Sequence, residues 1–238
     1  IQIIEISGMI PRLKASISAR EVIAALSIWK SDCVAKFEQD FANLTGQKYA
    51  TAFPYGRTGL VALLRAMSLE GKEVICPAYT CVVVPHAIVT AGCLPVFVDS
   101  QVTDFNMDWS HVEAAVTPNT GAVIATSIFG NPVDLDAVDR FKETYPNIRI
   151  IQDCAHSFLA EWKGRQVNLT GDAAFFGLNI SKIITATFGG MVTTDSESLN
   201  QSLLRSRYEL LEPMRPLKSA SRILYLLAVA FGFHRSVY

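Results

Sequence analysis

The sequence predicts an α/β protein with a mostly parallel sheet and helices on both of its faces, giving three layers. Short apolar segments alternate with segments of helical periodicity between about residues 45 and 210. Turn-forming or polar residues follow most of the apolar segments, as expected where strands end. Right-handed connections between such strands place helices over both faces of a parallel sheet. Ligands of these sheets bind beyond the carboxyl ends of the strands.

Residues 1–45 are expected to form an N-terminal arm with helices. Ser18 is expected to cap a first helix that holds residues 21–29. A second helix over about residues 32–44 is indicated by apolar side chains at helical spacing, namely Val34, Phe37, Phe41 and Leu44.

Residues 46–212 carry the alternation and are expected to form one large domain. Strands are expected at residues 48–53, 74–76, 95–98, 122–127, 149–152, 173–176 and 191–194. Helices are expected at residues 60–67, 82–90, 113–116, 135–144 and 197–210. The residues that follow strand ends are candidates for a site: Gly56, Tyr79, Asp99, Phe129, Asp153 and Gly177.

Residues 213–238 are expected to form an apolar C-terminal tail. The apolar run over residues 223–233 is shorter than the ~18–20 residues that a membrane span needs. A buried or interfacial helix is therefore expected, and association with a membrane is not. A helix that lies beside a membrane is the alternative.

Composition narrows the class of protein. The chain has 238 residues, 50% of them hydrophobic, which is enough to bury a sizeable core. Its 21 basic and 22 acidic residues give a net charge of −1, so no basic surface for nucleic acid is expected. The five cysteines show neither a CxxC pair nor a Cys/His ligand spacing, which argues against a disulfide framework and a metal site. We expect a cytoplasmic protein with reduced thiols and no secretory signal.

Asp153 is the strongest single candidate for chemistry. An apolar strand delivers this carboxylate to the carboxyl edge of the predicted sheet. Asp153 could cap a helix. It could instead bind a protonated heterocyclic nitrogen through a charge-assisted hydrogen bond, worth ~1.5–3 kcal/mol. In pyridoxal 5′-phosphate (PLP), such a bond keeps the ring protonated, so that the ring can accept electrons.

Lys182 is the second candidate, because it lies in an unusually apolar stretch. Burying an ammonium group is costly, so the side chain could extend to solvent. It could instead be a desolvated amine with a lowered pKa that forms a Schiff base. Gly189-Gly190 follows, and it would let the backbone pass close to a ligand or to another chain.

A glycine turn at residues 54–60 is the third candidate. It leads into a predicted helix, whose first N–H groups and positive dipole end are suited to a phosphate group. Arg57 and Thr58 add side-chain donors. Many ordinary turns have the same composition, and the segment is neither a Walker loop nor a GxGxxG motif.

Taken together, these residues resemble the DegT/DnrJ/EryC1/StrS family of sugar aminotransferases, a branch of the fold-type I PLP-dependent enzymes. The resemblance covers about residues 10–210 and rests on the order and spacing of several motifs. The motifs are Thr45-Gly, Gly56-Arg-Thr-Gly-Leu, Val74-Ile-Cys-Pro-Ala-Tyr-Thr, Ala91-Gly-Cys-Leu-Pro-Val-Phe-Val-Asp, Phe129-Gly-Asn-Pro-Val-Asp, Asp153-Cys-Ala-His-Ser, Gly171-Asp-Ala-Ala-Phe-Phe, Ser181-Lys and Gly189-Gly.

The resemblance implies a role for each matching residue. Lys182 would hold PLP as a Schiff base and act as the catalytic acid and base, and Asp153 would bond the pyridine nitrogen. His156 would lie against the ring oxygen of the cofactor, although it could also be an ordinary core imidazole. The phosphate would be bound by Gly56, Arg57 and Thr58.

Three positions depart from the pattern of the family. Cys81 stands where relatives often have an aromatic ring stacked on the cofactor, and Tyr79 or another aromatic residue could replace that ring. Gly177 stands where a serine often helps to hold the phosphate, and Phe188 where many relatives have a small or acidic residue. Phosphate affinity and substrate shape are therefore expected to differ.

The resemblance also implies substrates and partners. We expect an amino group to pass, from glutamate as the donor, to a keto sugar linked to a nucleotide, in the biosynthesis of amino sugars, polysaccharides or glycans. Relatives continue into a small C-terminal domain and form homodimers, so this sequence is expected to be part of a longer, dimeric protein.

Two alternatives remain from the sequence. Dehydratases of the same family carry histidine instead of the lysine, so Lys182 argues against that activity. The other alternative is a truncated or degenerate PLP-binding homologue without turnover, which would act as a dimerisation or regulatory partner.

Overall fold

The computed structural model describes residues 19–25, 32–212 and 216–232. Its α-helices are α1 (Ala19–Ala25), α2 (Cys33–Thr45), α3 (Gly56–Ala66), α4 (Val83–Thr90), α5 (Trp109–Ala114), α6 (Leu135–Thr144), α7 (Glu197–Leu210) and α8 (Pro216–Gly232). Its strands are β1 (Tyr49–Phe53), β2 (Glu73–Pro77), β3 (Leu94–Val98), β4 (Thr120–Thr126), β5 (Arg149–Asp153), β6 (Glu161–Trp162), β7 (Arg165–Gln166), β8 (Ala173–Gly177) and β9 (Gly190–Thr194). Two short 3-10 helices are η1 (Ile128–Gly130) and η2 (Val167–Leu169).

Seven of these strands form one sheet in the order β1-β9-β8-β5-β4-β2-β3. The pairs β2–β3, β2–β4, β4–β5 and β5–β8 are parallel. β9 runs antiparallel to both of its neighbours, β1 and β8, and is thus the one strand of this sheet with reversed direction. The prediction of a mostly parallel sheet is confirmed.

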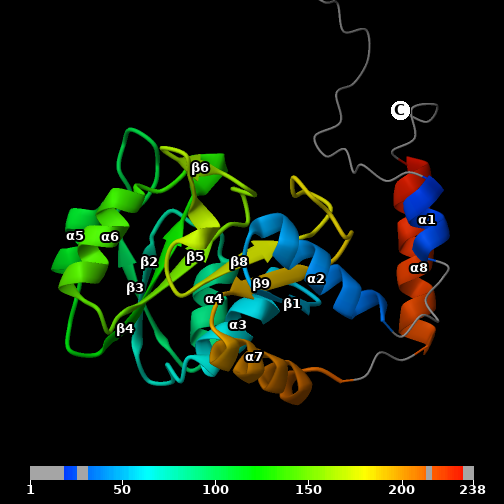
Figure 1. Cartoon of the computed structure of the whole chain (residues 1–238), viewed down its shortest axis with the longest axis horizontal. Coiled ribbons are helices and arrows are strands. Elements are labelled where there is room, and N and C mark those ends of the chain that lie inside the picture. Colours follow the sequence, from blue (N-terminus) through cyan, green and yellow to red (C-terminus); the bar gives the residue numbers. More distant parts are fainter. Residues whose placement is uncertain (1–18, 26–31, 213–215, 233–238) are drawn as a thin grey trace, which may run out of the picture.

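Helices cover both faces of the sheet, which confirms the predicted three layers (Figure 1). Apolar side chains fill the space on each face and exclude water from the strands between them. One core joins the sheet to α2, α5 and α6, and its large members include Phe41, Trp109, Leu135 and Phe141. The other core joins the opposite face to α3, α4 and α7, and its members include Leu60, Leu63, Ile88 and Leu203.

The limits of several elements differ from those predicted. α3 begins at Gly56, four residues before the predicted start, because the helical turn includes the glycines that suggested a loop. α5 begins at Trp109, where Asp108 caps it by accepting a hydrogen bond from the Ser110 N–H at 2.9 Å. α6 and α7 match their predicted ranges. The first helix was predicted over residues 21–29, and α1 covers residues 19–25. Ser18, its predicted cap, and residues 26–29 lie outside the described residues.

α2 is attached to the sheet by a partly buried ion pair. Glu38 of α2 pairs with Arg207 of α7, and its Oε1 atom also accepts a hydrogen bond from the Ala52 N–H at 2.7 Å. Phe41 of the same helix packs in the core with the sheet. α2 and the sheet therefore share one hydrophobic core. The domain limits after residues 45 and 212 stay predictions.

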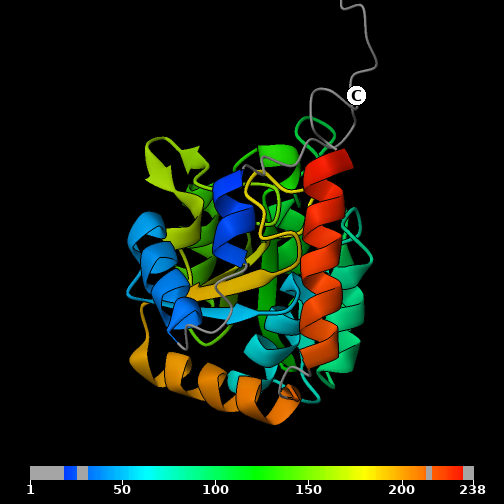
Figure 2. The ribbon, with the colours of Figure 1, turned by 90° about the vertical axis from the view of Figure 1, so that its right-hand side faces the viewer.

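α8 lies beside α1 at one end of the molecule, where the two helices make contact (Figures 1 and 2). Val229 is its buried side chain, whereas Leu224 and Phe231 are 66% and 71% exposed. The predicted apolar tail is thus a helix over residues 216–232, one face of which is directed away from the domain. In the described part of the chain, every helix is too short or too polar to traverse a bilayer.

Candidate active site

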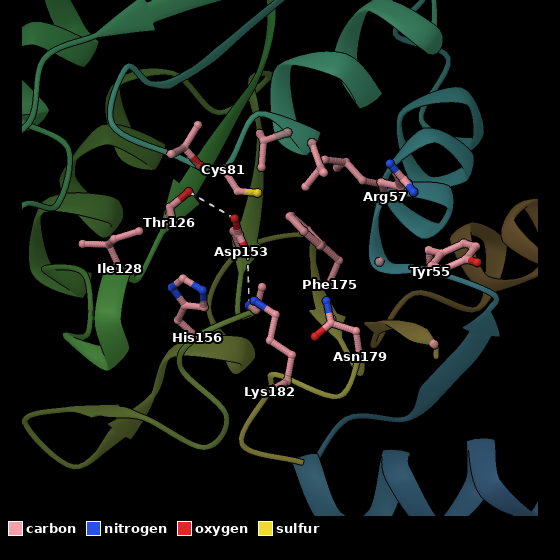
Figure 3. Close-up of a pocket in the computed structure, with 18 residues that line it drawn as sticks. Tyr55, Arg57, Cys81, Thr126, Ile128, Asp153, His156, Phe175, Asn179 and Lys182 are labelled. Carbon is pink, nitrogen blue, oxygen red and sulfur yellow. Dashed lines mark hydrogen bonds between the residues drawn. The ribbon is translucent and has the colours of Figure 1, made fainter. Parts of the chain in front are cut away.

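A cavity of about 210 Å³ lies at the carboxyl edge of the sheet. It is lined by ends of β4, β5 and β8, by the start of α3 and by the segment after β8 (Figure 3). The structure brings together five of the six predicted site residues on its wall: Gly56, Arg57, Asp153, His156 and Lys182. Thr58, the sixth, is half-buried in α3 and is not one of the lining residues.

Asp153 is the last residue of β5 and lies next to Thr126, the last residue of β4, in the parallel register. Its Oδ1 atom accepts a hydrogen bond from the Ala155 N–H at 3.0 Å, and its Oδ2 atom accepts one from the Thr126 hydroxyl at 3.4 Å. The residues that follow form turns, and no helix begins there. Asp153 is therefore not a helix cap.

The Asp153 carboxyl group is almost completely buried, at 5% exposed. Burial raises its pKa to about 6, while the Ala155 hydrogen bond and the charge of Lys182 act in the opposite direction. Among the described residues it forms no ion pair. A buried carboxylate of this kind is stabilised by a cationic donor inside the cavity.

A tight turn places Lys182 in the cavity. The Asn179 carbonyl accepts a hydrogen bond from the Lys182 N–H at 3.0 Å, and the Asn179 side chain accepts from the Ser181 N–H, also at 3.0 Å. Gly177 leaves room for the lysine, because a Cβ atom there would lie 3.2 Å from Lys182 Cε. A larger side chain at this position would crowd the lysine in its present conformation.

Lys182 is half-buried and is directed into the cavity rather than to bulk solvent. Burial lowers the pKa of its amine, and the nearby Asp153 and Cys81 act in the opposite direction. The direction of this shift is the one predicted for a desolvated amine. A lysine with a lowered pKa has a larger fraction of neutral amine, which is the nucleophilic form.

His156 lies between the cavity and a surface aromatic ring. Its ring is nearly parallel to that of Phe129, at an angle of 12° and a centroid distance of 6.2 Å. Burial lowers the pKa of the imidazole, and the charge of Lys182 lowers it further. Near neutral pH the imidazole is therefore uncharged and can both donate and accept a hydrogen bond.

The start of α3 offers unpaired backbone donors to the cavity. The Tyr55 carbonyl accepts the first hydrogen bond of the helix from the Gly59 N–H at 3.1 Å. The three preceding N–H groups, of residues 56–58, have no backbone acceptor among the described residues. The Arg57 guanidinium lies over the Tyr55 ring, 5.3 Å from its centre, at the rim (Figure 3).

Gly190 fixes this turn from the sheet. A Cβ atom on Gly190 would lie 2.3 Å from Gly56 N and 2.5 Å from the Tyr55 carbonyl carbon, so only glycine fits there. The predicted close approach of the Gly189-Gly190 backbone is therefore made within the chain, to the beginning of α3.

Several lining residues were not predicted from the sequence. Thr126 and Asn179 support Asp153 and Lys182, and Phe175 lines the wall between β8 and α3. Thr126 could have been found, because it ends the strand expected beside that of Asp153. Either Tyr79 or another aromatic residue was expected to replace the ring missing at Cys81. Tyr79 contacts two other surface rings, Phe105 and Phe129, and does not line the cavity, whereas Phe175 does.

The arrangement suits a flat, anionic ligand with a basic ring nitrogen. A buried carboxylate, an amine and an uncharged imidazole lie on one cavity, and a helix N-terminus opens onto its rim. Among the described residues, no group of three or more His, Cys, Asp or Glu is placed to hold a metal ion.

Comparison with known proteins finds one matching family model. The model of the DegT/DnrJ/EryC1/StrS aminotransferase family matches residues 16–212. Among curated proteins, the GDP-perosamine synthase of Caulobacter vibrioides is 33% identical over 183 residues, which are 76% of this chain and 49% of that protein. The chain spans about half the length of the curated relatives it matches.

Solved structures show the same fold. The crystal structure of DesI in the presence of its TDP-sugar product has a TM-score of 0.78 and 27% identity, and the match covers 94% of this chain and 61% of that one. A structure of GDP-4-keto-6-deoxymannose-3-dehydratase with a trapped PLP-glutamate geminal diamine has a TM-score of 0.76 and 25% identity, over 82% and 54% of the two chains.

Proposed function

Because this chain belongs to the DegT/DnrJ/EryC1/StrS aminotransferase family, we propose that it provides the PLP-binding part of a sugar aminotransferase. The observation that carries the proposal is that Asp153 and Lys182, from different segments, line one cavity. Asp153 is buried and forms no ion pair among the described residues, and Lys182 is partly desolvated. These are the environments that a pyridinium nitrogen and a covalently attached aldehyde carbon require.

Each residue has a separate task in this proposal. PLP, when bound, supplies an electron sink for the pair left behind when a proton leaves the substrate carbon. Asp153 holds the proton on the ring nitrogen. Lys182 anchors the cofactor through its amine and, once released, carries the proton at the substrate carbon. His156 hydrogen-bonds the ring oxygen, and the first N–H groups of α3, those of Gly56 and Thr58 included, bind the phosphate together with the Arg57 side chain.

For the amino acceptor we propose a keto sugar linked to a nucleotide, and for the donor glutamate. The perosamine synthase is named for a GDP-linked sugar, DesI was crystallised in the presence of its TDP-sugar product, and the dehydratase structure holds a PLP-glutamate adduct. Lys182 supports amino transfer over dehydration, because dehydratases of this family have histidine in its place. The similarity to relatives of known activity does not favour a homologue without turnover.

A homodimer is part of the same proposal. Tyr79, Phe105 and Phe129 form an aromatic cluster beside the cavity, and each side chain is at least 50% exposed. Exposed aromatic clusters of this kind are typical of interfaces. Sedimentation of the wild type and of Phe129→Asp tests this point, since the charged variant would be monomeric if the cluster is buried between two copies.

Absorbance and chemical trapping test the cofactor. The chain incubated with PLP should develop a visible absorbance band, and borohydride reduction should fix the cofactor on Lys182, as shown by peptide mass spectrometry. Lys182→Ala should abolish both signals. Lys163→Ala is the matched control, because its side chain is 67% exposed and belongs to a surface ion pair. An unchanged spectrum in Lys182→Ala would contradict the proposal.

The amino transfer is tested in two halves with the same preparation. Glutamate alone should bleach the visible band, and addition of a keto sugar nucleotide should restore it. A visible band that glutamate fails to bleach would show that glutamate is not the donor. If no keto sugar nucleotide restores the band, this class of sugar is not the amino acceptor.

A further inference from the structure

Tyr55 is held at the rim of the cavity by an arginine from a distant helix. Tyr55 lines the cavity and comes directly before Gly56, the first residue of α3. Arg222 of α8 donates a hydrogen bond from Nη2 to the Tyr55 hydroxyl at 3.0 Å, across a sequence separation of 167 residues. Through this bond, a helix outside the sheet contacts the wall of the cavity.

Aromatic rings hold the Arg222 guanidinium in place. Its Cζ atom lies 3.8 Å from the centre of the Phe188 ring. The Tyr225 ring, nearly one helical turn further along α8, lies 4.9 Å from the same Phe188 ring, and the Tyr55 ring lies 6.2 Å from it. A guanidinium stacked on a ring face keeps its fork of donors in a fixed orientation.

The direction of the Arg222 side chain follows from the two faces of α8. Leu224 and Phe231 lie on the face that is directed away from the domain, whereas Arg222 is half-buried. The segment that carries Phe188 also carries Gly190, whose backbone packs against Tyr55 and Gly56. The turn before α3 is therefore fixed by Gly190 on one side and by Arg222 on the other.

We propose that Arg222 is a positioning residue that fixes the turn at Tyr55 and Gly56 for binding of a phosphate group. Backbone N–H groups bind an anion well only when their directions are set before the anion arrives. Tyr55 is the N-cap residue of α3, so the orientation of its ring and its backbone determines where those N–H groups point. This inference rests on the proposed function, because that function identifies the ligand as PLP. The binding of a phosphate group by the turn can be tested without it.

Three ligands separate the phosphate from the rest of the cofactor. Isothermal titration of the wild-type chain and of Arg222→Gln would use PLP, pyridoxal without the phosphate, and inorganic phosphate. Arg222→Gln should weaken the binding of PLP and of inorganic phosphate by roughly five- to twentyfold, as expected for loss of a charge-assisted hydrogen bond. The affinity for pyridoxal should stay unchanged. Lys218→Gln removes the same charge from an exposed position on α8 and should change none of the three affinities.

A second variant tests whether Arg222 acts through Tyr55. Tyr55→Phe removes the hydroxyl that accepts the Arg222 hydrogen bond and keeps the ring. If the two residues act as a unit, the double variant should bind PLP no more weakly than Arg222→Gln alone. Arg222→Lys, which keeps the charge and one donor, should recover part of the affinity.

The possible outcomes are distinct. Unchanged PLP and phosphate affinities in Arg222→Gln would overturn the inference. Equal weakening of PLP and pyridoxal, or a lowered melting temperature with unchanged affinities, would show that Arg222 only anchors α8, and would overturn it as well. If wild-type protein gives no Lys182-linked PLP, the proposed function fails instead, and the inorganic phosphate titrations still decide whether Arg222 acts on the turn.

Discussion

Gly190 lies so close to Gly56 that a Cβ atom added to Gly190 would be 2.3 Å from the Gly56 nitrogen. Both partners are backbone, so neither can move aside without displacing β9 or the start of α3. Gly190→Ala should therefore lower the free energy of unfolding by about 2–4 kcal/mol, measured by urea denaturation, and weaken PLP binding. Gly232→Ala is the control, because no atom of the described residues lies within 4 Å of its added Cβ. Similar stabilities for the two variants would refute the prediction.

Asp153→Asn should stabilise the cofactor-free chain at high pH. Burial raises the Asp153 pKa from 3.8 to about 6, so the folded state binds its proton more tightly than the unfolded state. The contribution of that proton to stability is complete below pH 3.8 and is lost as the pH rises through 6. The variant should be more stable by up to about 3 kcal/mol at pH 8, and the difference should narrow as the pH falls from 6 towards 4.

Urea denaturation across this pH range measures the difference. Glu113→Gln, which replaces an exposed carboxylate on α5, is the control and should change the free energy of unfolding little at pH 8. With PLP bound, the order should reverse, because the carboxylate then has a cationic partner. If the wild type without cofactor is more stable than Asp153→Asn at pH 8, the prediction that the buried carboxylate destabilises the chain is wrong.

Lys182→Met should raise the pKa of His156. The charge of Lys182 is one of the two causes that lower this pKa, after burial, and the variant removes it. The midpoint of the His156 imidazole signals in an NMR titration should therefore move towards the ordinary value for histidine. Lys163→Met, on the outer surface, should leave the midpoint in place. A midpoint that does not respond to Lys182→Met would place the amine farther from the imidazole than the structure does.

Glu38→Gln should destabilise the chain. The Glu38 side chain is 14% exposed and pairs with Arg207, whose side chain is 27% exposed. The amide of the variant can still accept a hydrogen bond from the Ala52 N–H. The Arg207 guanidinium, however, loses its anionic partner. A loss of about 1–3 kcal/mol in thermal or urea unfolding is expected. Lys163→Gln breaks the more exposed pair with Asp136 and should have little effect. Equal effects would indicate that the Glu38 pair is fully solvated.

The sheet and most helices could be predicted, because the local pattern of apolar and polar residues indicates where strands and helices form. Apolar strand segments and helical spacing are properties of neighbouring residues, and α6 and α7 follow them to their predicted ends. The same pattern does not encode direction, so the reversal of β9 could not be predicted. β6 and β7, with two residues each, are too short to show alternation.

The site could be predicted where a strand end delivers a side chain. Asp153 is a candidate from the end of its strand and Lys182 from the apolar stretch around it, and both line the cavity. Contacts between distant segments could not be predicted, because no local property links Arg222 to Tyr55 or Gly190 to Gly56. Of the aromatic residues expected to replace the ring missing at Cys81, Tyr79 packs with Phe105 and Phe129 instead, and replacement by another aromatic residue stays a prediction.

Because β9 runs antiparallel to β8, the segment that carries Lys182 is a hairpin loop closed by these two strands. Gly177 and Gly190 pair across its base, and the Leu178 N–H donates to the Gly189 carbonyl at 2.9 Å. Residues inside a loop closed in this way can change in number and kind at small entropic cost. The Lys182 side chain therefore lies on a loop whose length and sequence can change while the strands β8 and β9 that close it keep their pairing.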